Sequence, residues 1–234
     1  MADRRLYGDY FGALNQDYTS PFETGELKVK KTFYVVVVKR FFDIVISLIA
    51  VVVTLPINLI MAIITFFTLG NPIIFSHYRP GLGEKLFKMV KFRNMTNEKD
   101  EKGELLPPDQ RVTKVGAFFR KTSLDELLQF WLILIGKMSI IGPRPLLVYY
   151  LPGYSKKQHL RHSVKPGLEC PLPVYKGEVT WEDRLNNDIW YAENVSFVTD
   201  IKMVFRLIKL VFNTDRAKTR SEKIDKSFVD LDAK

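Results

Sequence analysis

The sequence has very little cysteine and histidine. Cys170 is the only cysteine among 234 residues, and the histidines are His77, His159 and His162. A single thiol cannot form an intramolecular disulfide, and this cysteine usage is typical of the reducing side of a membrane. These four residues also lack the spacing of zinc ligands. The sequence therefore predicts a protein that faces the cytoplasm and contains neither disulfides nor a cysteine-rich metal site.

A secretory signal is also missing, because residues 1–32 have no short apolar stretch with a small-residue cleavage site. We expect 1–32 to form a polar, partly ordered arm. A membrane anchor over 33–72, a cytoplasmic catalytic domain over 73–213 and a polar tail over 214–234 complete the predicted organisation.

Positive charge is in excess, with 35 Lys and Arg against 26 Asp and Glu and a formal net charge of +9. This excess indicates an anionic partner, and nucleic acid, an acidic lipid surface or a phosphate-bearing substrate would each fit. Nucleic acid is the weakest of the three, because no helix-turn-helix, zinc-finger or aromatic RNA-binding signature accompanies the charge. The 47% hydrophobic content is sufficient for a core in one or at most two domains.

One long apolar segment runs from Phe41 to Leu69. As a straight helix it would reach about 43 Å, which exceeds the roughly 30 Å of a bilayer's hydrocarbon core. A buried helix of a soluble protein is the alternative, although such helices are usually shorter. We therefore expect a membrane helix.

Pro56 lies near the middle of this segment and predicts a kink at 54–55, because proline removes a backbone hydrogen bond and clashes with an earlier carbonyl. Each arm would then be too short to cross comfortably. Lysines and arginines flank both ends, and such residues prefer the cytoplasmic side. A re-entrant hairpin is therefore favoured over a simple span. Asp43 is expected to pair with Lys39 or Arg40 near the membrane surface.

After the apolar segment the sequence predicts a short strand over 73–75, a glycine-containing loop over 77–83 and then a basic stretch. Cations beside glycines suit phosphate contacts, and Arg79 and Lys91 are the candidates here. A plain turn at Arg79 and a solvated row of cations around Lys91 remain the alternatives.

The run Ser123-Leu124-Asp125-Glu126 carries the pattern of a capping box, which predicts an apolar helix that continues to about Ile135. Stabilisation of the helix dipole is the simple interpretation of the two acidic residues. The same position would surround Asp125 with free backbone amides, which keep a carboxylate ionised and can hold a phosphate nearby. An ionised carboxylate is a competent nucleophile.

Pro143-Arg144-Pro145 predicts a rigid turn that fixes an arginine between two prolines. Such a turn suits an anion clamp, and a loop arginine with a local ion pair is an equal alternative.

Together these residues resemble the bacterial sugar transferase family, the monotopic phosphoglycosyl transferases that begin lipid-linked glycan assembly. The resemblance extends from about Lys39 to Phe212. Its motifs are Lys39-Arg40-x-x-Asp43, the proline-broken helix, Arg79-Pro80-Gly81, Lys91-Phe92-Arg93-x-Met95, Ser123-Leu124-Asp125-Glu126-Leu127, Met138-Ser139-x-x-Gly142-Pro143-Arg144-Pro145, Lys165-Pro166-Gly167 and Tyr191-x-x-Asn194-x-Ser196-x-x-x-Asp200.

The resemblance implies an α-rich α+β fold, in which a re-entrant membrane helix joins a small cytoplasmic catalytic domain with amphipathic interfacial helices. It places the chain monotopically on the cytoplasmic face of the bacterial inner membrane, in contact with its lipid, and a homodimer is possible. The implied anchor residues are Lys39, Arg40, Asp43 and Pro56.

The resemblance also implies a mechanism. Asp125 attacks the sugar-proximal phosphorus of a UDP-sugar, UMP leaves, and polyprenyl (undecaprenyl) phosphate then takes the phosphosugar from the enzyme. Mg²⁺ would lie beside Asp125 and Glu126, because hard oxygen ligands suit that ion. The implied catalytic residues are Asp125, Glu126, Lys91 and Asp200, and the implied substrate-binding residues are Arg79, Arg120, Arg144, Pro143 and Pro145. For Asp200, a simple N-terminal charge on a helix over 200–212 is the alternative.

The chain departs from the family pattern at two places, and neither includes the proposed nucleophile Asp125. Lys137 stands where the family usually has an aspartate, and residues 168–173 replace a threonine-glycine-tryptophan-glutamine pattern. The second departure bears on sugar and nucleotide contacts. A membrane-anchored scaffold that only binds anionic lipid is the alternative function, and it would tolerate Asp125→Asn.

Overall fold

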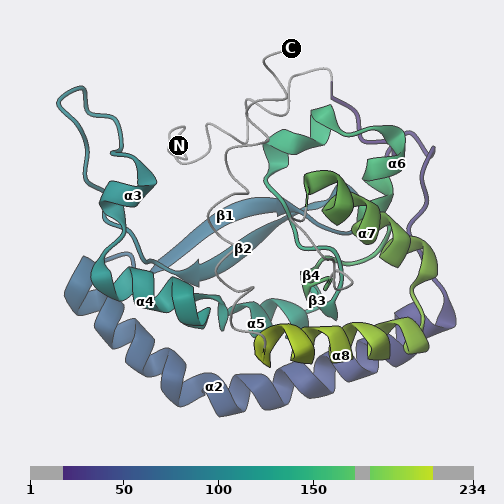
Figure 1. The fold of residues 1–234 in the computed structure, drawn as a ribbon, viewed down its shortest axis with the longest axis horizontal. Coiled ribbons are helices and arrows are strands. Elements are labelled where there is room, and N and C mark those ends of the chain that lie inside the picture. The colour runs from purple at the N-terminus through teal and green to yellow at the C-terminus, as the bar shows by residue number, and fades with distance from the viewer. Residues whose placement is uncertain (1–17, 172–179, 213–234) are drawn as a thin grey trace.

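The computed structural model describes residues 18–171 and 180–212, and most of them are helical (Figure 1). The predictions for residues 1–17, the tail 214–234 and residues 172–173 lie outside the described residues. The helices are η1 Tyr34–Val38, α2 Lys39–Leu69, η2 Leu82–Glu84, α3 Pro108–Arg111, α4 Lys114–Thr122, η3 Leu124–Glu126, α5 Gln129–Leu134, η4 Val148–Gly153, α6 Lys156–His159, η5 Leu160–Ser163, α7 Trp181–Asn194 and α8 Phe197–Phe212. The strands are β1 Ile74–Pro80, β2 Leu86–Phe92, β3 Ser139–Ile141 and β4 Gly167–Glu169. The predicted α-rich α+β class is confirmed.

Pro56 lies inside helix α2, which is continuous from Lys39 to Leu69. Figure 1 shows it as a shallow arc under the domain, with both ends turned toward the strands. Its buried residues recur at intervals of three, four or seven positions, so one face packs against the domain while apolar side chains cover the other. The segment Tyr34–Leu69 is, within the described part of the chain, the one helix long and apolar enough to cross a membrane.

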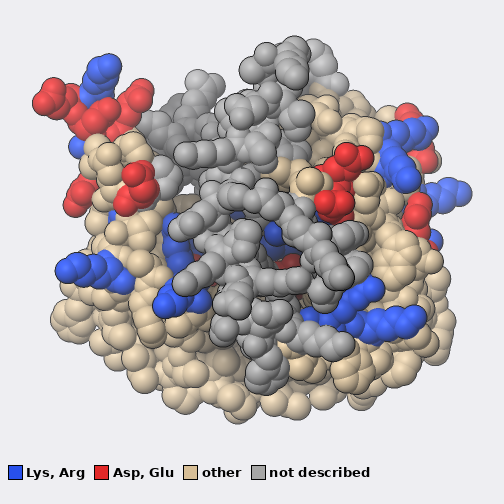
Figure 2. Space-filling view, viewed as in Figure 1, with Lys and Arg blue, Asp and Glu red and all other residues tan. Residues whose placement is uncertain are grey.

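A second apolar surface lies on α8, which starts three residues earlier than the helix predicted from Asp200. Figure 1 places α8 and α5 just above α2 near the lower edge, and Figure 2 shows the lowest rim, where α2 runs, without charged side chains. We call the outward side of α2 and α8 the apolar face. Its exposed side chains on α8 are Phe197, Val198, Ile201, Val204, Phe205 and Ile208.

Strands β1 and β2 form an antiparallel hairpin. The prediction of a loop from residue 77 is wrong, because β1 continues to Pro80 and pairs residue by residue with β2. Arg79 lies opposite Phe87, and Phe75 lies opposite Lys91. Directly opposed residues share a face, and alternate residues of one strand also share a face. Arg79 and Lys91 therefore belong to the same side of the hairpin.

The predicted capping box is also wrong. Ser123 has a φ of 56°, caps the end of α4 in the left-handed conformation, and makes no side-chain capping bond. A left-handed residue ends a helix and redirects the chain. Asp125 and Glu126 consequently lie in the short turn η3, and the next helix begins only at Gln129.

Two glycines allow the parallel strands β3 and β4 to approach closely. A Cβ atom added to Gly167 would lie 2.2 Å from the nitrogen of Gly142, and one added to Gly142 would lie 2.6 Å from the carbonyl oxygen of Lys165. Such distances exclude any side chain at either position. The glycines therefore bring the loop that carries Arg144 beside the segment that follows Lys165.

Candidate active site

Asp125 is the centre of the candidate site and is only 4% exposed. Its Oδ2 atom accepts a hydrogen bond of 2.9 Å from the side-chain amide of Asn94, which follows β2. Gly116 of α4 permits this contact, because a Cβ atom there would lie 2.0 Å from the carbonyl oxygen of Asn94. The hairpin and α4 thus fix the carboxylate from two sides.

Burial raises the pKa of the Asp125 carboxyl, and the neighbouring charge of Glu126 raises it further. Lys91, Arg120 and the hydrogen bond from its own backbone amide act in the opposite direction. The hydrogen bond from the backbone amide acts in the expected direction, and the loss of solvation outweighs it in the net shift.

Cations surround the two carboxylates. Burial lowers the pKa of Lys91 while Asp125 and Glu126 oppose the shift, so the ammonium group lies within electrostatic reach of both. Burial also lowers the pKa of Arg120, against the attraction of Asp125. Burial and the nearby Arg144 lower the pKa of Arg79 to about 10, and Glu126 opposes that shift. The positive charges outnumber the carboxylates, which suits an added diphosphate.

Glu126 forms an ion pair of 2.5 Å between its Oε1 atom and Nη2 of Arg144. Nη1 of Arg144 donates a second bond, of 3.1 Å, to the carbonyl oxygen of Leu168. Pro143 and Pro145 are both buried on either side of this arginine. Arg144 is thus a local ion-pair partner. One of its two bonds joins it to the turn that carries Asp125, and the other holds its guanidinium group in place.

The departure from the family pattern at residues 168–173 contributes backbone atoms to this arrangement. Leu168 offers its carbonyl oxygen to Arg144, and Cys170 offers its carbonyl oxygen to the side-chain amide of Asn187 at 3.2 Å. Neither carbonyl depends on the side chain of its residue. Lys137, the other departure, is exposed in the turn before β3.

Asp200 lies at a different place. Its carboxylate accepts hydrogen bonds from Lys39 at 2.7 Å and from the hydroxyl groups of Tyr34 and Tyr191 at 2.6 Å each. Among the described contacts, none joins Asp200 to Asp125, Glu126 or their cations. These bonds instead tie the start of α2 to α7 and α8.

The expected ion pair between Asp43 and Lys39 or Arg40 does not form. Asp43 accepts two hydrogen bonds from β3, and Arg40 donates two to the last carbonyls of α5, where a helix leaves such groups free. The bonds run to Asp43 Oδ1 from Ser139 Oγ and Ile140 N at 3.0 Å each, and from Arg40 Nη1 and Nη2 to Ile133 O and Leu134 O at 2.6 Å each. The anchor residues therefore dock α2 onto the domain.

Comparison with known proteins places this arrangement in a family. Residues 34–214 match the sequence model of a family described as bacterial sugar transferase. The chain belongs to the bacterial sugar transferase family.

Individual relatives agree with this assignment. The chain is 40% identical to the sugar transferase EpsL of Bacillus subtilis over 176 residues, which cover 75% of this chain and 87% of EpsL. It is 39% identical to the UDP-glucose:undecaprenyl-phosphate glucose-1-phosphate transferase of Klebsiella pneumoniae over 180 residues, 72% of this chain and 39% of that protein. It is 34% identical to the undecaprenyl-phosphate galactose phosphotransferase of Salmonella typhimurium over 200 residues, 76% of this chain and 41% of that protein. The chain thus spans about two fifths of the last two relatives.

Two residues of this sugar transferase were missed by sequence reasoning. Asn94 follows the basic strand, and only its contact with Asp125 identifies it. His77 lies on the same side of the hairpin as Arg79, two residues away, and neither of its ring nitrogens has a hydrogen-bond partner within the described residues. Burial and the charges of Arg79 and Lys91 lower its pKa to about 3, so the imidazole is neutral beside these cations.

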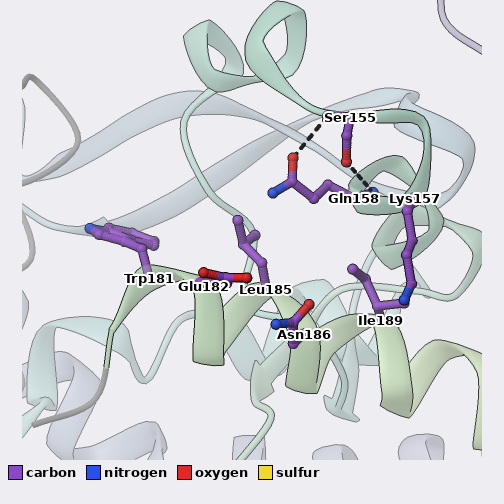
Figure 3. A pocket seen from close by; sticks show the side chains of 8 residues that line it. All are labelled: Ser155, Lys157, Gln158, Trp181, Glu182, Leu185, Asn186 and Ile189. Atoms are coloured by element: carbon purple, nitrogen blue, oxygen red, sulfur yellow. Dashed lines mark hydrogen bonds between the residues drawn. The ribbon is translucent and has the colours of Figure 1, made fainter. Parts of the chain in front are cut away.

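A separate hollow of about 370 Å³ lies between α6 and α7 (Figure 3). None of the residues predicted for catalysis or phosphate binding lines it. The lining residues are Ser155, Lys157, Gln158, Trp181, Glu182, Leu185, Asn186 and Ile189.

Proposed function

We propose that this sugar transferase moves a sugar-1-phosphate from a UDP-sugar to polyprenyl (undecaprenyl) phosphate through a covalent intermediate on Asp125. The observation that carries the proposal is the buried Asp125 carboxylate. The cations near it outnumber the two carboxylates, and its neighbour Glu126 is held in an ion pair with Arg144. The named relatives from Klebsiella and Salmonella are undecaprenyl-phosphate sugar phosphotransferases, which supports the same substrate classes here.

In the first step a carboxylate oxygen of Asp125 attacks the phosphorus next to the sugar. The bond from this phosphorus to the bridging oxygen breaks, and UMP leaves with the electron pair. Lys91, Arg120 and Arg79 would neutralise the charge that develops on the phosphates, and such electrostatic stabilisation is the main catalytic term in phosphoryl transfer. The product is an aspartyl phosphosugar.

In the second step a phosphate oxygen of the polyprenyl acceptor attacks the phosphorus of this adduct. The bond to the Asp125 oxygen breaks, which regenerates the carboxylate and leaves a lipid-linked diphosphate sugar. Covalent catalysis of this kind divides one difficult transfer into two easier ones. The apolar face and α2 would place the acceptor's lipid tail in the bilayer, on the cytoplasmic side of the inner membrane.

The carboxylates of Asp125 and Glu126 fit a Mg²⁺ ion that is shared with the substrate. The described residues contain no group of three or more potential metal ligands. Mg²⁺ commonly binds proteins through only one or two carboxylates together with substrate phosphates. The ion would screen the diphosphate from the two carboxylates. Chelation should abolish UMP release and added Mg²⁺ should restore it, whereas full activity in chelator would refute a metal requirement.

Trapping of the adduct tests the mechanism. Enzyme incubated with a labelled UDP-sugar, Mg²⁺ and no lipid acceptor should release UMP and carry the label on the Asp125 peptide, as found by mass spectrometry. Asp125→Asn should abolish labelling, and Asp109→Asn, at an exposed position on α3, should leave it unchanged.

Two results would contradict the proposal at different levels. Normal turnover with both substrates but no adduct in the trapped enzyme would favour direct transfer to the lipid phosphate. A failure to release UMP from a panel of UDP-sugars with polyprenyl phosphate and Mg²⁺ would favour the membrane-anchored scaffold.

A further inference from the structure

Arg161 is a deeply buried cation outside the Asp125 cluster. This η5 residue is 2% exposed. Its Nε and Nη2 atoms donate to Oδ2 of Asp188 on α7 at 3.1 and 2.6 Å, and Nη1 donates to the hydroxyl group of Tyr154 at 3.4 Å. A buried ion pair is costly to form, which raises the question of whether this pair has a role besides stability.

One bond of Arg161 leads into the candidate active site. Its Nη2 atom also donates to the backbone carbonyl oxygen of Arg144 at 2.7 Å. The Arg144 side chain in turn bonds Glu126 and the carbonyl oxygen of Leu168. A continuous series of bonds therefore runs from Asp188 through Arg161 and Arg144 to the residue next to the nucleophile.

The bond from Arg161 restrains the backbone of Arg144, whose side chain is long and 38% exposed. An unrestrained arginine has about 2 kcal/mol of rotamer entropy. Pro145 restricts the preceding residue to extended conformations, but a range of ψ remains open within them. Rotation about the Cα–C bond of Arg144, which changes ψ, would turn its carbonyl group relative to its side chain. A hydrogen bond to the carbonyl oxygen opposes this rotation.

We infer that the Asp188–Arg161 pair positions Arg144, and through it Glu126, for phosphosugar transfer. This inference rests on the proposed function. Both members are positioning residues, because Arg161 contacts the backbone of Arg144 and Asp188 holds Arg161. The planar fork of an arginine can serve two acceptors at once, whereas the ammonium of a lysine acts as a point charge. Arg161→Lys should therefore keep the charge and weaken the link to Arg144.

A double-mutant cycle tests the inference through UMP release. Arg161→Lys should lower kcat by about 10- to 100-fold, since small misplacements of orienting groups have effects of this order. In an Arg144→Lys background the same change should alter kcat by less than about 2-fold, because residues that act through one another are not additive. Equal losses in both backgrounds would overturn the inference.

Asp188→Asn is the second variant, for use if Arg161→Lys does not fold. It retains size and one acceptor, and its cycle with Arg144→Lys should show the same lack of additivity. Lys156→Gln is the matched control, because it removes an exposed ion pair of 2.8 Å with Glu26 and should leave kcat unchanged. Loss of the cooperative melting transition in both Arg161→Lys and Asp188→Asn would make the pair purely structural and would overturn the inference.

Amide hydrogen exchange provides a measurement that does not require turnover. Exchange in residues 142–147 should accelerate in Arg161→Lys and Asp188→Asn while α8 keeps its wild-type rates. Unchanged exchange in 142–147, or equal acceleration throughout the domain, would contradict a positioning role. If the wild type transfers no UDP-sugar, the proposed function fails, and the exchange result still reports whether Arg161 holds the Arg144 loop.

Discussion

Asp125 carries its charge in surroundings that penalise it. Burial and Glu126 raise the pKa of its carboxyl, while Lys91 and Arg120 only partly compensate. A nucleophilic carboxylate must nevertheless be ionised. In the proposed mechanism the substrate's phosphates would bind the same cations, and the burial of Asp125 would be a trade-off between activity and stability of the kind frequent in active sites.

The pH dependence of kcat/KM should report this environment. The proposed mechanism requires ionised Asp125, so activity should fall as the pH drops through a pKa that lies above the ordinary aspartate value of 3.8. Glu126→Gln removes the second cause of the increase and should move this acid limb to lower pH, although the maximal rate falls. Glu104→Gln, at an exposed loop position, should not move it. A limb that moves to higher pH in Glu126→Gln would contradict this account.

Asp125→Asn should not destabilise the fold. A carboxyl whose pKa is raised by folding favours its protonated form in the native state, so it lowers stability at any pH above that pKa. Asparagine removes this penalty and keeps an oxygen for the bond from Asn94. We expect Tm near pH 7 to stay constant or to rise by a few degrees, since about 1 kcal/mol corresponds to roughly 2–4 °C at this chain length. A thermal melt that shows a drop of more than about 4 °C would disprove the penalty.

At the scale of elements, the Asp125 turn depends on the end of α4 and on its contact with the hairpin. Ser123 ends the helix in a left-handed conformation, and Gly116 lets the chain at Asn94 approach α4. The left-handed region is unfavourable for residues other than glycine by about 1–2 kcal/mol, so the surrounding packing must maintain it. The turn is therefore defined by its neighbours as well as by its own residues.

Gly116→Ala tests this dependence. Its Cβ would lie 2.0 Å from a backbone oxygen, so α4 or the chain at Asn94 must shift. Overpacking of this kind costs about 1–3 kcal/mol, and loss of the Asn94 contact should lower UMP release by about 10-fold or more. Gly153→Ala is the matched control, because a Cβ there meets nothing within 4 Å. If both variants retain wild-type Tm and turnover, the close contact does not support the site.

At the scale of the whole molecule, three polar contacts fasten α2 to the catalytic domain. Lys39 binds Asp200, Arg40 binds the end of α5, and Asp43 binds β3. All three lie in the first turns of the helix. Both ends of α2 turn toward the domain in Figure 1, while the apolar face points away from it. We therefore keep the prediction of a helix that enters and leaves through one leaflet, which would leave both of its ends on the side of the domain.

The re-entrant arrangement predicts that tags at Met1 and Lys234 are both cytoplasmic. Pro56→Leu should straighten α2 and move part of the population to a spanning form, because the constraint that bends the helix is gone. Single cysteines introduced at the two ends can report the topology by labelling with a membrane-impermeant reagent, since Cys170 is buried. A periplasmic N-terminus in the unmodified protein would exclude the hairpin.

Features that depend on local pattern and composition could be predicted from the sequence. The long apolar helix and its internal Pro56 follow from composition and length. The fold class came from the resemblance to the family. The ordered series of motifs from Lys39 to Asp200 indicated the family. The specific roles of these residues stay predictions that the trapping and pH experiments address.

Which polar groups contact one another could not be predicted from the sequence and became visible in the folded chain. Spacing along a helix predicted that Asp43 pairs one turn away, but acceptors and donors at α5 and β3 replace those neighbours. The S-x-x-E pattern predicted a cap, but the chain at Ser123 adopts a left-handed turn that packing imposes. Asp200 and Arg161 bind residues far away in sequence. Local sequence records only what is favourable within a few residues, whereas buried charges must find partners wherever the fold places them.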